Sequence, residues 1–129
     1  MAAVPARGAA PASVPATNAA RARVALTAGE DRADIAFKAL KTFDREIAAA
    51  IGDKRIILKP NNVVASNALA CTHAQNLEGI LEFLKSIGKL ANVTIAESGA
   101  AAPTLDGFAG LGYNALAAKY NVKLMDLDQ

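Results

Sequence analysis

Two short runs of apolar and β-branched residues, separated by a segment with helical periodicity, place the strongest constraint on the fold. The runs are residues 55–58 (RIIL) and 92–96 (NVTIA), and the first has the unbroken apolar character of a strand buried on both faces. Between them, apolar residues recur on one helical face over 77–87, and Gly88 is a natural helix stop. This order favours two parallel strands joined by a right-handed crossover.

The segments on either side extend the same pattern. Residues 23–28 alternate apolar and polar side chains and predict a strand, and residues 31–51 place apolar side chains on one helical face. Towards the C-terminus, a short helix from Thr104 and another over 113–120 precede a last strand at 122–127. The predicted order is therefore β-α-β-α-β-α-β, an α/β fold with a mostly parallel four-stranded sheet and flanking helices.

We expect this domain to span residues 23–129 and to be the N-terminal part of a larger α/β domain. A four-stranded parallel sheet is small, and no helix follows the last predicted strand. A complete small domain is the alternative. Residues 1–22 hold three of the five prolines among alanines, and such a segment buries too little apolar surface to fold. We predict a disordered Ala/Pro-rich tail there, with a processing segment as the alternative.

Charge and the counts of metal-binding residues exclude several functional classes. Arginines in and next to the tail account for the net charge of +2, so the folded part does not predict nucleic-acid binding. One cysteine and one histidine cannot form a four-cysteine zinc site or a complete iron–sulfur ligand set. No apolar run reaches about 18 residues, so no membrane span is predicted. We expect a cytoplasmic protein, with an exported form as the alternative.

Polar side chains follow the predicted parallel strands at the edge where open α/β sheets bind their ligands. The residues that follow the second and third predicted strands are Lys59, Asn61, Asn62, Glu97 and Ser98. Thr72 and His73 begin a helix on the same side of the sheet. We predict catalytic roles for Lys59, as a fixed cation, and for His73, as an acid–base group or metal ligand. The other residues, Thr72 included, are predicted to bind the ligand, and no metal is assigned.

Each of these residues also has a structural interpretation. Lys59 and Glu97 can form an ion pair, because a carboxylate buried at the end of a strand needs a partner. Thr72 fits a helix N-cap, with a glutamine three residues later completing a capping box. His73 can then be an exposed and inert residue of the first turn, and adjacent asparagines are typical of turns.

Several stretches in combination resemble a known family. They are residues 56–61 (IILKPN), Thr72-His73, residues 93–98 (VTIAES), and Phe108 with Gly112-Tyr113 ahead of the last strand. Together they resemble the N-terminal part of the family called domain of unknown function 362, over about residues 23–129. This resemblance implies a larger two-lobed α/β protein without an agreed biochemical activity. Carried over by position, its candidate site comprises Lys59, Asn61, Thr72, His73, Glu97 and Ser98.

The sequence departs from the family pattern in two places. Ala74 stands where a proline commonly follows the Thr-His pair, and the chain has no cysteine cluster. Longer members often carry cysteine-rich, ferredoxin-like segments, and some have export signals, so the resemblance places any iron–sulfur site beyond Gln129 or nowhere. The family is also distantly similar to the nickel-dependent lactate racemase superfamily.

We therefore predict a truncated enzyme or redox-associated protein that binds an anionic small molecule or cofactor at the carboxyl ends of the strands. One alternative is a non-catalytic interaction module that associates through an open sheet edge or an unfinished face. Another is an inactive fragment. The sequence assigns neither a reaction nor a cofactor.

Overall fold

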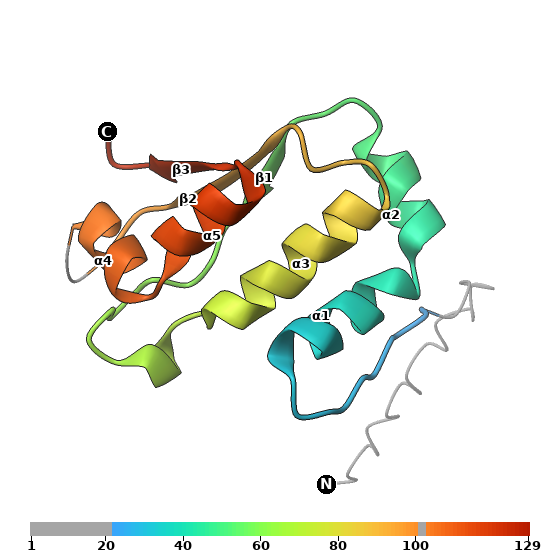
Figure 1. The fold of residues 1–129 in the computed structure, drawn as a ribbon, viewed down its shortest axis with the longest axis horizontal. Helices are drawn as coiled ribbons and strands as arrows, with labels where there is room; N and C mark the ends of the chain where they lie inside the picture. The colour runs from blue at the N-terminus through green and yellow to red at the C-terminus, as the bar shows by residue number, and fades with distance from the viewer. Residues whose placement is uncertain (1–21, 101–102) are drawn as a thin grey trace, which may run out of the picture.

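The computed structural model describes residues 22–100 and 103–129 and contains a small parallel sheet with helices (Figure 1). In chain order the elements are α1 (Arg32–Lys41), α2 (Asp44–Ile51), β1 (Ile56–Leu58), the 3-10 turn η1 (Ala68–Ala70), α3 (Ala74–Ser86), β2 (Val93–Glu97), α4 (Thr104–Gly110), α5 (Tyr113–Tyr120) and β3 (Lys123–Asp126). The α/β class and the parallel strands are confirmed. The predicted tail, residues 1–22, lies outside the described residues except for Ala22.

The sheet has three strands in the order β1-β2-β3, and both neighbouring pairs are parallel. Leu58 of β1 pairs with Ile95 of β2, and Glu97 of β2 pairs with Asp126 of β3. β2 is the central strand and is the most buried. The expectation that residues 55–58 form a central strand buried on both faces is wrong, because β1 is an edge strand whose Ile57 is 62% exposed.

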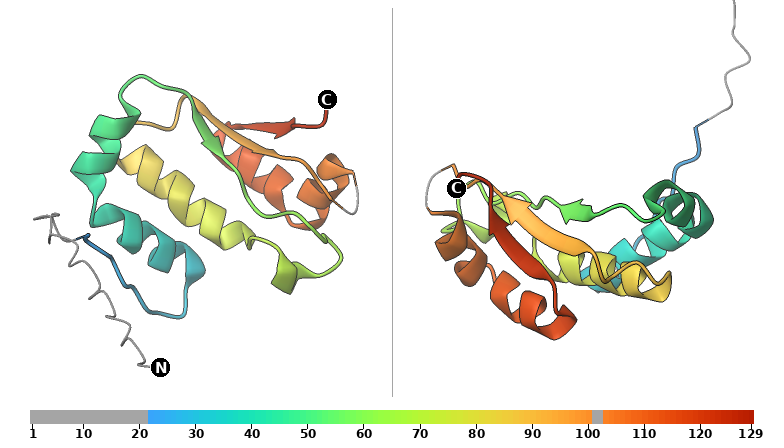
Figure 2. Two further views of the ribbon diagram at one scale, coloured as in Figure 1. Left: turned by 180° about the vertical axis from the view of Figure 1, so that it is seen from behind. Right: turned by 90° about the horizontal axis from the view of Figure 1, so that it is seen from above.

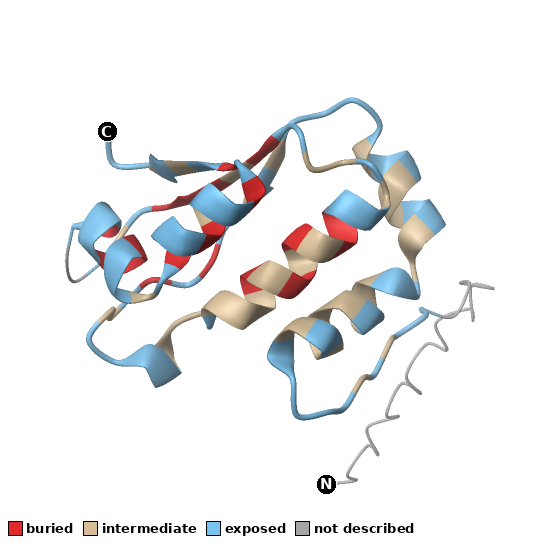
Figure 3. Cartoon of the chain, in the orientation of Figure 1, coloured by how far each residue is buried: buried red, intermediate tan, exposed pale blue. Residues whose placement is uncertain are grey.

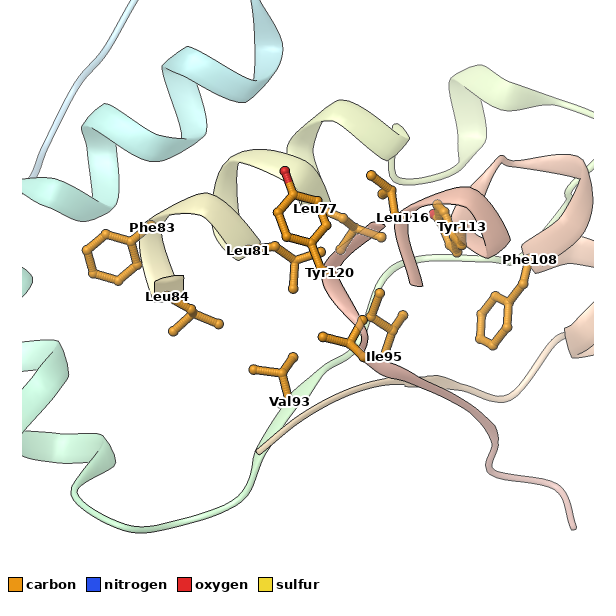
Figure 4. Packing of buried hydrophobic residues seen from close by; sticks show 11 residues of the cluster. Leu77, Leu81, Phe83, Leu84, Val93, Ile95, Phe108, Tyr113, Leu116 and Tyr120 are labelled. Atoms are coloured by element: carbon orange, nitrogen blue, oxygen red, sulfur yellow. The ribbon is translucent and has the colours of Figure 1, made fainter. Parts of the chain in front are cut away.

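The core lies between the sheet and the helices on one of its faces, as Figure 2 shows for α3 and α5. Figure 3 places the buried residues on the inward sides of these helices and along β2. Side chains from α3, β2 and the C-terminal helices converge there (Figure 4). The buried cluster comprises Leu77, Leu81, Phe83, Leu84, Val93, Ile95, Phe108, Tyr113, Leu116, Tyr120 and Val122.

The predicted first strand, residues 23–28, does not form, and the four-stranded sheet becomes three-stranded in the described part of the chain. Val24 and Leu26, the apolar residues that should have faced a sheet, are 84% and 95% exposed. The segment is extended and is held to the helices instead: the Arg23 guanidinium pairs with Glu46, and Thr27 Oγ1 donates to the Ile35 carbonyl oxygen at 3.1 Å. Because it runs beside the α1–α2 layer, it does not reach a sheet edge.

The predicted helix over 31–51 is two helices. α1 ends where Phe43 leaves the helical region at φ −120°, and α2 then begins at Asp44 and ends at Gly52, which adopts φ +52°. Thr42 Oγ1 bonds back to the Lys38 carbonyl oxygen at 3.3 Å, a pattern that bends helices. The apolar face predicted for one helix therefore continues from α1 to α2 across the interruption at Phe43. The spacing of the apolar residues does not indicate this interruption.

α1 packs closely along α3. Gly79 of α3 lies so near α1 that a Cβ on this glycine would stand 2.2 Å from the Ala33 carbonyl oxygen and 2.9 Å from the Ala36 Cβ. Beside this contact, the rings of Phe37 and Phe83 meet edge-on with centroids 6.4 Å apart. The contact thus depends on small residues at the crossing, flanked by an aromatic pair.

Candidate functional site at the carboxyl end of the sheet

Lys59 and Glu97 meet where β1 and β2 end. The Lys59 Nζ lies 2.7 Å from both carboxylate oxygens of Glu97. The Glu97 side chain is 5% exposed, whereas the Lys59 side chain is 62% exposed. The buried carboxylate therefore holds an ammonium group that remains in contact with solvent. The adjacency of the two strands places this pair across the sheet, and the ion pair is one of the two interpretations that the sequence left open.

Local backbone contacts fix the position of the Glu97 carboxylate. Its Oε1 accepts a hydrogen bond from the Ser98 amide at 2.8 Å, so the buried charge has two donors. The Glu97 carbonyl oxygen accepts from the Leu127 amide at 2.9 Å, which ties the end of β2 to the residue after β3. Ser98 itself is exposed. We use the name rim group for Lys59, Glu97 and Ser98.

Asn61 and Thr72 order the loop after β1. The Thr72 Oγ1 accepts from the Asn61 amide at 2.9 Å, and the Asn61 carbonyl oxygen accepts from the Thr72 amide at 2.9 Å. The Asn61 Nδ2 donates to the Ala70 carbonyl oxygen at 3.0 Å. Both predicted ligand-binding side chains are thus engaged in holding the two ends of this loop together.

Asn62 is buried beside α4 rather than presented at the rim. Its Nδ2 donates to the Thr104 carbonyl oxygen at 3.3 Å, while its buried Oδ1 has no hydrogen-bond partner among the described residues. The side chain lies against Gly107, where an added Cβ would stand 2.4 Å from both amide atoms. Its contacts connect the loop after β1 to α4.

His73, not Thr72, is the N-cap of α3. The His73 Nδ1 accepts a hydrogen bond from the Gln75 amide at 3.2 Å, while the Thr72 hydroxyl bonds to the Asn61 amide instead. The capping-box prediction is therefore wrong by one residue, since Thr72 is drawn into the loop. In the neutral imidazole that this bond requires, the proton is on Nε2.

No hydrogen bond or ion pair joins His73 to the rim group. The histidine lines a separate hollow of about 270 Å³ with Ala68, Ala74, Gly110 and Leu111.

Substitutions at His73 separate its capping from any chemical role. We expect His73→Ala to lower the free energy of unfolding by about 1 kcal/mol, because the Gln75 amide loses its acceptor. His73→Asn supplies a good N-cap without an imidazole and should stay within a few tenths of a kcal/mol of the original chain, or exceed it slightly. Urea unfolding monitored by circular dichroism measures both. Equal destabilisation by alanine and asparagine would contradict the capping role.

Tyr113, the first residue of α5, connects this helix to the loop that precedes α3. Its hydroxyl donates to the Thr72 carbonyl oxygen at 2.5 Å, and the residue has no solvent exposure. Burial, and after it the neighbouring Cys71 and Glu97, raises the pKa of the Tyr113 phenol to about 12. The sequence offered only its helical position as a signal, so its contact with the Thr72 loop was not predicted.

The raised pKa values of the two tyrosines predict how the stability of the folded protein depends on pH. Burial, and after it the Glu82 carboxylate, raises the pKa of Tyr120 to about 12 as well. Since an unfolded tyrosine has a pKa of about 10, the unfolded chain loses these protons first, and the free energy of unfolding should fall as pH rises from 10 through 12. The chain has no tryptophan, so phenolate absorbance reports these residues directly. Titration of the native protein with both phenols near pH 10 would contradict their burial.

The rim group contains one carboxylate, that of Glu97. In the described ranges, 22–100 and 103–129, no cluster of three or more His, Cys, Asp and Glu side chains could hold a metal ion. Asp126 is the register partner of Glu97, but its carboxylate oxygens accept hydrogen bonds from the Asp128 amide and the Gln129 side chain.

Among residues 22–100 and 103–129, no helix has the length and apolar character needed to cross a membrane.

Comparison of the chain with models of protein families identifies a match. The model of the family described as a domain of unknown function (DUF362) matches residues 56–129. The match begins at β1 and contains the whole sheet, α3 to α5 and the rim group, while α1 and α2 precede it. Neither the curated proteins nor the solved structures contain a match to this chain.

Proposed function

Since the chain belongs to the domain of unknown function family DUF362, whose model covers its sheet, we propose that it is part of an enzyme or redox-associated α/β protein. Its rim group would bind an anionic small molecule or cofactor. The carboxyl end of parallel strands is where open α/β sheets bind ligands. The rim group lies at this end of the sheet, where β1 and β2 end.

The accessible ammonium of Lys59 is the observation that carries this proposal. Its Nζ is positioned by both Glu97 oxygens at 2.7 Å, yet the side chain remains 62% exposed. An ammonium has three donors, so the carboxylate does not exhaust them. A phosphate or carboxylate oxygen of a ligand would accept from the same nitrogen, for which lysine acts as a point charge. The buried Glu97 would then set the position of this cation.

Two further donors are assigned to the site in this proposal, Ser98 of the rim group and His73 of the separate hollow. The exposed Ser98 follows directly on Glu97, and its hydroxyl would donate to the ligand. His73, with Nδ1 engaged in the α3 cap, would present its Nε2–H as a donor rather than act as a base. Asn61, Asn62 and Thr72 would support the loop and have no direct contact with the ligand in this proposal.

Calorimetric titration of the full chain with inorganic pyrophosphate tests the proposal. We expect saturable binding that Lys59→Met weakens by about tenfold or more, because a charge-assisted contact is lost. Lys85→Met is the matched control, since the Lys85 side chain is also 62% exposed but lies at the end of α3. No saturable binding, or equal weakening by both substitutions, would contradict the proposal.

The capping-neutral variant His73→Asn tests the second donor in the same titration. We expect it to weaken binding by a few-fold, roughly the value of one neutral hydrogen bond, without the loss of stability seen in His73→Ala. Unchanged affinity in His73→Asn would limit this residue to its capping role and confine the site to the rim group.

A further inference from the structure

One face of the sheet has no helix over it in the described part of the chain. α3 and α5 cover the other face (Figure 2). On the uncovered face, the exposed fraction of Ile57 is 62% and that of Met125 is 47%. A hollow of about 370 Å³ runs over Ile57, Thr94 and Met125. Parallel sheets are normally covered on both faces, so this apolar surface is unusual for the fold.

Two cations flank this face at the amino ends of the strands. Arg55 precedes β1 and lines the hollow over Ile57, and Lys123 begins β3 as the register partner of Thr94. A second hollow of about 170 Å³ lies along both cations, with Asn92 and Asn121 beside them. Neither Arg55 nor Lys123 forms an ion pair within residues 22–100 and 103–129.

We propose that this face binds an amphipathic α-helix of a second polypeptide, whose apolar stripe covers Ile57 and Met125. Acidic residues at one end of that helix would pair with Arg55 and Lys123. The outer strands of a three-stranded sheet lie roughly 10 Å apart, close to the 10–12 Å diameter of one helix. A helix is also the element that covers parallel sheets elsewhere.

Charge argues against the chain's own N-terminal segment as the occupant. The charged side chains of residues 1–21 are Arg7 and Arg21, which have the wrong sign to pair with Arg55 and Lys123. A second copy of the chain would present the same face, whose hollows are lined by Arg55 and Lys123 and by no carboxylate that could pair with them. The observations therefore favour an acidic helix.

Two synthetic helical peptides test this inference on the full chain. Both carry the same leucine and alanine stripe, and they differ only in having glutamates or lysines beside it. We expect the glutamate peptide alone to bind and to shift the NMR signals of Ile57, Thr94 and Met125. Reversing both cations, in Arg55→Glu with Lys123→Glu, should weaken it by about tenfold, the sum expected for two surface ion pairs turned repulsive.

A second double reversal provides the control. Arg32→Glu with Arg45→Glu makes the same charge change at exposed positions on α1 and α2 and should leave binding unchanged. Equal binding of the two peptides, or signal changes away from the sheet face, would overturn the inference. A dimer in sedimentation that protects the same residues, or displacement of residues 1–21 from the face, would overturn it in favour of those occupants.

Discussion

Gly79→Ala is expected to destabilise the protein by about 2–4 kcal/mol, although alanine is the better helix former. The new Cβ would stand 2.2 Å from the Ala33 carbonyl oxygen, a backbone atom that cannot move without shifting α1. The two helices would separate, and the Phe37–Phe83 contact would loosen with them. Urea unfolding monitored by circular dichroism measures the loss.

Gly110→Ala is the matched control for this prediction. Gly110 ends α4, and an added Cβ there meets nothing within 4 Å. The same chemical change should therefore stabilise the protein by roughly 0.4–1 kcal/mol through helix propensity and a more restricted unfolded chain. Similar effects of the two substitutions would show that α1 does not pack on α3 at Gly79.

Lys59→Met is expected to lower the free energy of unfolding by about 1–3 kcal/mol, because it leaves the buried Glu97 carboxylate with one donor. This loss of stability is smaller than the loss expected for a fully buried ion pair, because the Lys59 side chain is exposed to solvent. Chemical denaturation of the purified chain measures it.

Adding Glu97→Gln in the same chain should recover much of this loss. The glutamine has nearly the same shape, and its amide oxygen still accepts from the Ser98 amide, but no charge is buried. A double variant less stable than Lys59→Met would contradict the view that the uncompensated charge is the source of the loss. Additive effects would show that the two side chains are not coupled.

The segment β1–α3–β2 could be predicted because several local signals agree there. A β-branched run ended by Pro60, a helical stripe over 77–87 and a second run at 92–96 all support one supersecondary unit. The burial of each strand could not be predicted in the same way. Residues 55–58 are apolar throughout, yet β1 is an edge strand, because burial depends on which elements exist on either side.

The absence of the predicted first strand has a tertiary cause. Residues 23–28 alternate like a strand, but an alternating hexamer also suits an extended segment anchored by Arg23 and Thr27. In the structure this segment runs beside α1, which packs on α3 through Gly79, and it therefore lies away from the sheet. Such a contact joins residues far apart in the chain and leaves no periodic signal.

The candidate site was predictable in part. The Lys59–Glu97 contact follows from two adjacent parallel strands, so strand order alone brings these residues together. The roles of Asn62 and Thr72 depend on tertiary partners, the Thr104 carbonyl oxygen and the Asn61 amide, that no local pattern indicates. Competition for the Thr72 hydroxyl is also what moves the α3 cap to His73.

Mapping pyrophosphate binding by amide NMR tests the central proposal most directly, because accessible cations lie at both ends of the sheet: Lys59 at the carboxyl end, and Arg55 with Lys123 at the amino end. We predict saturable shifts at the Lys59 and Ser98 amides, where β1 and β2 end. Shifts confined to Arg55 and Lys123 at the amino ends, or shifts that grow without saturation, would contradict a ligand site formed by the rim group.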